Sequence, residues 1–193
     1  MTTPMLRGYT IKQTVSFIES PHFDAQIRRR ILEELPSDVR GALPAIKPAE
    51  WYPRDYVMSM LRGIASVKND DVGSYNDLVA YGGYVASEAT NTFLKLFMKV
   101  LTPTLFAKKI PEIWQRDHKG SGQFEVDVTR ANEGHIAMRL VGADGFDHIG
   151  IAAIGFITFG LSNMGKRDVQ IKQTGWSLAT PSPHEIKYQV SWK

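Results

Sequence analysis

The residues of this chain that are best suited to chemistry are its five histidines, and their spacing does not build a site. No two of them are three or four residues apart, so no helix could present two imidazoles to one metal ion. The sequence also contains no cysteine, which excludes disulfides, thiolate metal sites and cysteine nucleophiles. The sequence therefore predicts no metal centre. The histidines are His22, His118, His135, His148 and His184.

Two of these histidines stand near helix ends. Asp144 and Asp147 precede His148, but Asp147 lies where a helix is expected to begin, and an aspartate there is a common N-cap. We interpret this group as helix capping rather than as a metal site. His118 follows a predicted helix that contains Trp114, and a histidine at the negative end of a helix is favourable for structure alone.

Motifs for nucleophilic catalysis and for phosphate binding are missing. The sequence has no G-x-S-x-G elbow, and its paired glycines, such as Gly82-Gly83, lack the spacing of a phosphate loop. The carboxylates Glu125 and Asp127 alternate with apolar residues, so they belong on the exposed face of a strand. We therefore predict no catalytic residues and no enzymatic activity.

Length and composition are those of an ordinary globular domain. The 193 residues fit a single domain, 1–193, and 43% of them are hydrophobic and 22% charged. The 23 Lys and Arg residues against 20 Asp and Glu residues are a mild excess, and Arg28, Arg29 and Arg30 fall in a helical pattern that points them to solvent. We expect no nucleic-acid partner.

No stretch of the chain resembles a membrane span. The longest uncharged apolar run, residues 149–161, is shorter than the roughly 20 residues that a spanning helix needs. Residues 1–8 contain no apolar run of the kind that a signal peptide requires. The expected location is the cytoplasm.

Helix signals dominate residues 1–120. Asp24 is the expected N-cap of the second helix, Pro53 the first-turn proline of the third, and Thr102 the cap of a later helix that Pro111 should interrupt. Ser74 and Asp77 resemble a capping box that opens the longest helix. The expected helices cover residues 9–20, 24–35, 53–64, 75–101, 102–110 and 110–118.

Residues 121–193 show the two-residue period of β-strands on both sides of one helix-length stretch. Apolar and polar residues alternate strictly in two pairs of strands, and the stretch between the pairs, residues 148–164, contains no charged residue. We therefore predict an α+β fold, in which an N-terminal helical bundle is followed by a four-stranded antiparallel ββαββ sheet packed on helices. The expected strands begin near Phe124, Ile136, Val169 and Ile186.

Glycines mark two places where helices could meet closely. Gly82-Gly83 weakens the long helix by about 1 kcal/mol per glycine, which a close approach of another backbone would justify and a simple kink would also explain. Gly150, Gly155 and Gly160 make the uncharged helix thin. They allow either tight packing on the sheet or space for a ligand, and both alternatives remain open at this point.

Several short motifs occur in a fixed order along the chain: Leu32, Leu35-Pro36, Trp51-Tyr52-Pro53, Phe93, Phe97, Pro111, Trp114, Tyr188, Val190 and Trp192. Their order resembles that of a family of small paralogous proteins of the Myxococcus–Sorangium type, over residues 6–192. That family is similar to a superfamily that includes four-vinyl-reductase domains, sensor domains of phenol-responsive activators, heme-NO-binding domains and TRAPP vesicle-tethering subunits. The resemblance implies an α+β ligand-binding fold, often dimeric.

The chain departs from that superfamily at the positions that hold cofactors. Zinc-containing members carry cysteines where this chain has residues 180–185, and heme-binding members carry a proximal histidine and a Tyr-x-Ser-x-Arg motif. Residues 101–113 contain no histidine, and the motif is absent. We therefore expect neither zinc nor heme, and no other cofactor.

The leading hypothesis is a non-enzymatic sensory or regulatory domain that binds a small hydrophobic ligand between helices and sheet. For any single candidate lining residue, ordinary core packing is the more common role. The candidates are Phe93, Phe97, Trp114, Phe156, Phe159 and Trp176.

The alternative is an interaction module with a filled core, which would form a homodimer or recruit a partner protein in bacterial signalling or motility. Tyr75, Tyr81 and Tyr84 on the long helix would be its contact surface, because tyrosines suit partly wet interfaces.

Overall fold

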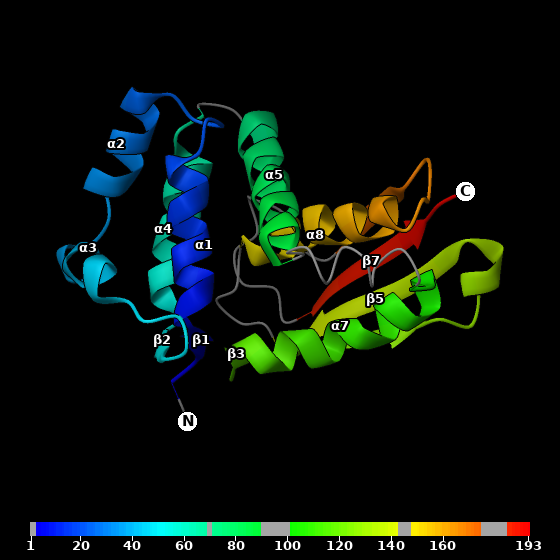
Figure 1. Cartoon of the computed structure of the whole chain (residues 1–193). Helices are drawn as coiled ribbons and strands as arrows, with labels where there is room; N and C mark the ends of the chain where they lie inside the picture. The colour runs from blue at the N-terminus through cyan, green and yellow to red at the C-terminus, as the bar shows by residue number, and fades with distance from the viewer. Residues whose placement is uncertain (1–2, 69–70, 90–100, 143–147, 175–184) are drawn as a thin grey trace.

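The computed structural model describes residues 3–68, 71–89, 101–142, 148–174 and 185–193. It confirms the α+β class: helices fill the N-terminal part, and a four-stranded antiparallel sheet forms most of the C-terminal part (Figure 1). In the N-terminal part, α1 (Gly8–Glu19) and α4 (Asp55–Ser66) pack together through side chains that are fully buried. Among these are Ile11, Ile18, Leu61 and Ile64.

Three shorter helical segments connect α1 to α4. They are α2 (Ala25–Glu33), α3 (Ser37–Ala42) and a 3-10 turn (Leu43–Ala45). The predicted cap of α2 is confirmed, because the Asp24 side chain accepts a hydrogen bond from the Ile27 amide at 2.8 Å. Arg29 and Arg30 of α2 are exposed and pair with glutamates one turn later, as expected of a solvated helix face, whereas Arg28 is half-buried and donates to the Glu19 carbonyl.

A small antiparallel sheet was not anticipated. Its strands are β1 (Met5–Arg7), β2 (Trp51–Pro53) and β3 (His118–Lys119), in the order β2-β1-β3. Pro53 therefore ends a strand instead of opening a helix, and α4 begins at Asp55. Strands of two or three residues are too short to show a period of their own. The sheet ties the start of the chain to the end of α7.

The long helix α5 (Asp71–Ala89) begins earlier than the proposed capping box allows. Ser74 lies inside the helix and donates its hydroxyl proton to the Ala65 carbonyl. Asp77 is buried and hydrogen-bonds Nε2 of His22 at 2.9 Å. These residues make tertiary contacts rather than a cap, so this prediction was wrong. The expected continuation over residues 90–101 lies mostly outside the described residues.

The helix α7 (Pro103–Asp117) runs without a break through Pro111. The Thr102 hydroxyl accepts from the Leu105 amide, as predicted for its cap. The predicted interruption at Pro111 is wrong. Buried side chains on both sides of the proline, Phe106, Ile110 and Trp114, hold one continuous helix against the core.

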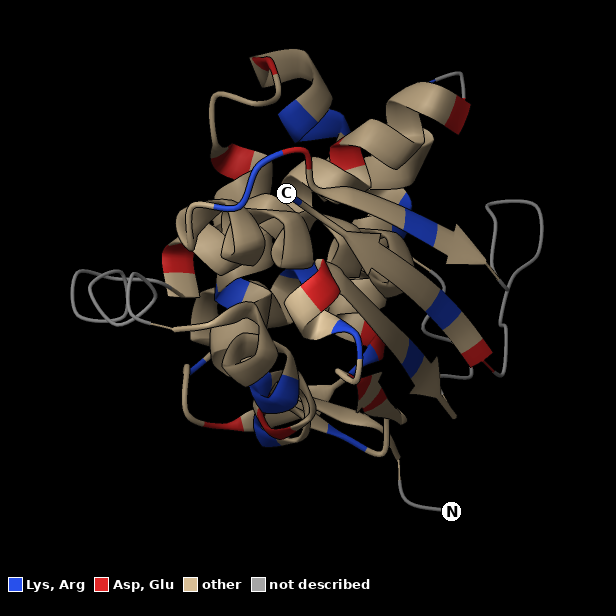
Figure 2. Cartoon of the chain, turned by 90° about the vertical axis from the view of Figure 1, so that its right-hand side faces the viewer, with Lys and Arg blue, Asp and Glu red and all other residues tan. Residues whose placement is uncertain are grey.

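The main sheet consists of β4 (Gln123–Asp127), β5 (His135–Val141), β7 (Glu185–Ser191) and β6 (Gln170–Thr174), in that order. The predicted alternation is confirmed, since Ile136, Met138 and Leu140 of β5 are buried while its intervening residues are not. The charged residues of β5 and β7 fall at positions between the buried ones, and Figure 2 shows them as coloured bands on the ribbon. Arg139 pairs with Glu125 and Glu185 across the register of β4, β5 and β7.

The uncharged helix α8 (Ile149–Asn163) follows β5 in the chain, and each of its three glycines faces a different neighbour. A Cβ on Gly150 would meet the Ile186 side chain of β7, one on Gly155 would meet the Val79 carbonyl of α5, and one on Gly160 would meet the Phe106 ring. A spacing of five residues turns about 140° around a helix, which explains the three directions. Tight packing is therefore the alternative that holds at all three glycines.

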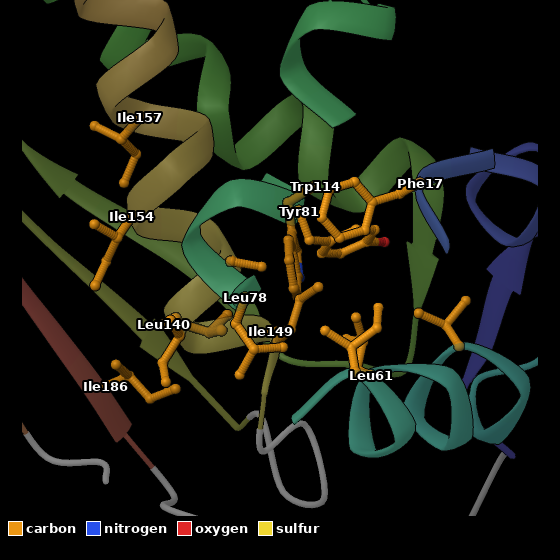
Figure 3. Packing of buried hydrophobic residues seen from close by; sticks show 14 of the residues in the cluster. Phe17, Leu61, Leu78, Tyr81, Trp114, Leu140, Ile149, Ile154, Ile157 and Ile186 are labelled. Carbon is orange, nitrogen blue, oxygen red and sulfur yellow. The ribbon is translucent and has the colours of Figure 1, made fainter. Parts of the chain in front are cut away.

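The glycine pair on α5 belongs to the same contact. A Cβ on Gly82 would lie 1.7 Å from the Ala152 carbonyl oxygen of α8, so the two backbones touch there. This is the close approach that the sequence left open. The contact holds α5 across α8 above the sheet, and Leu78 of α5 lies near Ile149 at the start of α8 (Figure 3).

Candidate ligand pocket

A pocket of about 100 Å³ lies where α1, α5, α7 and α8 meet the first strand of the main sheet. The lining side chains of α7 and α8 recur every three or four residues, so each helix presents one face to the pocket. Most of the wall is apolar or aromatic. The lining residues are Tyr9, Thr10, Tyr81, Gly82, Val85, Ile110, Ile113, Trp114, Asp117, His118, Phe124, Ile149, Ala152, Ala153, Phe156 and Ile157.

One end of the pocket is polar. Asp117, only 5% exposed, accepts the Tyr9 hydroxyl at 2.9 Å on Oδ2. Arg116 donates two further hydrogen bonds to the same carboxylate, from Nε to Oδ1 and from a terminal nitrogen to Oδ2. Burial, and then the neighbouring Asp117 charge, raise the pKa of Tyr9 to about 12. The hydroxyl is therefore protonated at neutral pH and fixed as a donor to Asp117.

His118 lies beside this group, at the end of α7. Its ring stacks on the Trp114 indole with 3.8 Å between centroids, and its Nδ1 lies 2.9 Å from the Trp114 carbonyl oxygen. Burial lowers the pKa of His118 to about 4, so the ring is neutral at pH 7. A carbonyl oxygen can only accept, and Nδ1 therefore carries the proton of the neutral ring.

The polar groups of Tyr81 and Trp114 in the pocket wall are engaged with the protein. The Thr14 hydroxyl donates to the Thr10 carbonyl, so the Tyr81 hydroxyl, 2.8 Å away, donates to Thr14. The Trp114 indole N–H donates to the Gly122 carbonyl at 3.1 Å. Tyr81 and Trp114 thus turn their rings to the pocket and their donors away from it (Figure 3).

The structure brings together two of the six predicted ligand-binding residues. Trp114 and Phe156 line the pocket, whereas Phe159 is half-buried and does not line it. The remaining predictions, Phe93, Phe97 and Trp176, lie outside the described residues.

The proposed tyrosine surface is not a single surface. Tyr81 is 1% exposed and belongs to the core, so it cannot contribute to a contact on the folded chain. Tyr75 and Tyr84 are half-buried and, nine residues apart, lie on opposite sides of α5. Tyr84 packs against Phe17 of α1. The physical reason is that the Tyr81 hydroxyl has an internal partner. Dimerisation itself stays a prediction.

Sequence reasoning missed the polar end of the pocket. Asp117 and His118 follow Trp114 at three and four residues, a helical spacing that could have placed them on the Trp114 face. Nothing in the sequence connects Tyr9 with Asp117, because 108 residues separate them. No group of three or more His, Asp or Glu side chains that could hold a metal ion occurs among the described residues.

Comparisons with known proteins identify the fold. No protein-family model and no curated protein matches the sequence. The Fe(II) unliganded H-NOX protein from K. algicida is similar, with 13% identity, a TM-score of 0.72 and 97% of both chains covered. The S. oneidensis H-NOX protein in its Fe(II)NO state has 13% identity and a TM-score of 0.68, with 97% of this chain and 99% of that chain covered.

The chain therefore has the fold of H-NOX, or heme-NO-binding, domains. The fold agrees with the one that the sequence resemblance implied, while membership of the superfamily and of the paralogous Myxococcus–Sorangium family stays a prediction. At this level of identity the likeness shows the fold alone. No helix among the described residues is both long and apolar enough to cross a bilayer.

The described residues do not fit a heme. Drug-sized ligands occupy pockets of roughly 300–1,000 Å³, and the pocket here has about 100 Å³. The α5 and α8 backbones touch at Gly82, which leaves no slot between them. Among the described residues that line the pocket, those able to serve as an axial ligand are His118, Tyr9 and Tyr81. The His118 ring lies flat on Trp114, and both tyrosine hydroxyls are held by internal acceptors.

Proposed function

We propose that this chain is a non-enzymatic sensory or regulatory domain that binds a small apolar molecule directly, without a heme. The molecule would occupy the pocket between α1, α5, α7 and α8. The domain would function in the cytoplasm. Its H-NOX fold would bind the ligand through packing contacts rather than through a metal ion.

The observation that carries this proposal is the pocket itself. Its walls are apolar on α5, α7 and α8, and its volume of about 100 Å³ is close to that of cavities which take up benzene or xenon. A ligand of that size has one ring or a few heavy atoms. Larger ligands would require the walls to move.

The position of the pocket suits a sensor. Its lining comes from α1, α5 and α7 in the N-terminal helical part and from α8 and β4 in the C-terminal part. The Tyr9–Asp117 hydrogen bond joins α1 to the end of α7 at the edge of the pocket. A bound molecule would therefore contact both parts of the fold at once, and could stabilise one arrangement of them over another.

The test is a binding measurement on the whole chain purified from cells supplied with a heme precursor. We expect no heme absorption band, and saturable binding of benzene in ligand-observed NMR. Ala153→Leu, which adds volume to the pocket wall, should abolish that binding. Ala49→Leu makes the same change at an exposed position and should leave binding intact.

Stoichiometric heme in the purified protein would contradict the proposal. A failure of benzene and similar single-ring probes to bind would also contradict it, and would favour the interaction module with a filled core.

A further inference from the structure

Three large side chains of the pocket wall already donate their hydrogen bonds to acceptors within the protein. Tyr9 donates to Asp117, Tyr81 to Thr14 and Trp114 to the Gly122 carbonyl. The Thr10 hydroxyl can serve as donor or acceptor. A ligand therefore finds no donor on these three large side chains, although all three line the pocket.

The acceptors are not used up in the same way. An ionised carboxylate has about four lone-pair sites. On Asp117, Oδ2 accepts from Tyr9 and Arg116, and Oδ1 accepts from Arg116 alone. Arg116 is exposed over 61% of its side chain and covers the carboxylate from the solvent side, while Asp117 also lines the pocket. Oδ1 therefore keeps one acceptor site that neither Tyr9 nor Arg116 uses.

His118 adds no donor at the same end. Its ring is neutral, and its one N–H, on Nδ1, donates to the Trp114 carbonyl. The charge on Asp117 is already balanced by Arg116, and a cationic ligand would find no excess negative charge there. What the end of the pocket lacks is a neutral hydrogen-bond donor.

We propose that the pocket selects small uncharged molecules with an apolar body and one N–H or O–H donor, which Asp117 receives at the polar end. This inference rests on the proposed function, because it names the class of ligand for the same pocket. A ligand without a donor would bury the Asp117 acceptor without a hydrogen-bond partner. Its binding free energy would therefore be less favourable than that of a ligand with a donor.

Pyrrole and thiophene test this selection on the whole chain. They are five-membered aromatic rings of similar size, and only pyrrole has an N–H donor. A hydrogen bond to a charged acceptor corresponds to roughly a tenfold difference in Kd. We expect pyrrole to bind roughly tenfold more tightly than thiophene in ligand-observed NMR titrations.

Two variants locate the effect. Tyr9→Phe keeps the ring and releases an acceptor site on Oδ2, so the preference for pyrrole should stay the same or increase. The double variant Tyr9→Phe/Asp117→Leu removes the acceptor together with the hydroxyl that it held, and the ratio of the two Kd values should fall toward one. If the double variant does not fold, the single variant still decides, because a reduced preference in Tyr9→Phe overturns the inference.

The outcomes separate the inference from the proposed function. Equal binding of both rings to the native chain overturns the donor selection and leaves a ligand pocket in place. Binding of neither ring overturns both. A preference for pyrrole that survives the double variant unchanged also overturns the assignment to Asp117.

Discussion

The two sides of α8 are built from the same small residues but are packed in opposite ways. On the side toward α5, Gly82 and Gly155 bring two backbones into direct contact. On the side toward α7, Ala153 and Phe156 border a pocket of about 100 Å³ with a polar end, and Gly82 and Ala152 line the edge at which the two sides meet. We call these the packed side and the pocket side.

The difference teaches that small residues on a buried helix do not by themselves indicate a cavity. A glycine that faces a neighbouring helix lets the backbone of that helix approach to direct contact, so no space remains between the two. A small residue leaves space only where larger neighbours, here on α7, hold their own helix at a distance. This comparison can be tested from both sides.

The largest effect is expected on the packed side. Gly82→Ala places a methyl group 1.7 Å from the Ala152 carbonyl oxygen, so the helices must separate. We expect a loss of about 3 kcal/mol in the free energy of unfolding, measured by urea denaturation.

Gly83→Ala is the matched control for that change. A Cβ there lies 3.9 Å from its nearest neighbour, the Gly155 carbonyl oxygen. The substitution should stabilise α5 by up to about 1 kcal/mol through helix propensity. Equal stability of the two variants would show that the helices are not in contact at Gly82.

On the pocket side, His118 makes stability depend on pH. Its pKa is lowered to about 4 in the folded chain, mainly by burial, so the unfolded chain takes up the proton first as pH falls. The contribution of neutral His118 to the free energy of unfolding is complete above pH 6.5 and is lost as the pH falls from 6.5 to 4. Because the ring is half-buried, we expect this loss to be about 2 kcal/mol.

The measurement for His118 is a urea denaturation series at pH values from 4 to 8. The variant His118→Phe keeps a ring on Trp114 and removes the titration, so the difference in stability from the native chain should change over that window. A constant difference would contradict a depressed pKa.

Tyr188→Phe tests how α8 is held to the sheet. The Tyr188 hydroxyl is buried and donates to the Gly150 carbonyl at 3.0 Å. Its removal should cost about 1 kcal/mol in the free energy of unfolding. No loss would mean that this hydrogen bond does not anchor the first turn of α8.

The smallest effect on stability is expected where the pocket is filled. Ala153→Leu adds volume to a half-buried wall residue, so the free energy of unfolding should change by less than about 1 kcal/mol. A loss as large as that of Gly82→Ala, in the same urea experiment, would mean that the pocket side is packed as tightly as the other side.

The sequence correctly predicted those parts of the fold that follow from local residue patterns. The four strands, the uncharged helix and the caps at Asp24 and Thr102 follow from local patterns, and the structure has them. The three-stranded sheet could not be predicted, because its strands are too short to alternate. Ser74 and Asp77 were misassigned because each hydrogen-bonds outside its own helix, to Ala65 and to His22, and a local pattern does not show such partners.

The pocket was less accessible to sequence reasoning than the fold. Trp114 and Phe156 were identified as aromatic residues on buried helix faces, which is a local property. Tyr81 was placed at the surface because a tyrosine hydroxyl usually needs water, yet Thr14 supplies an internal partner. The Tyr9–Asp117 pair joins opposite ends of the helical part, and only the folded chain brings them together.

The most direct test of the central claim is a crystal structure of the native chain under xenon pressure. Xenon enters dry apolar cavities of this size. We predict a xenon atom on the pocket side of α8, between Ile110, Ala153 and Phe156, and its loss in Ala153→Leu. A native chain with no xenon at that place would contradict the account.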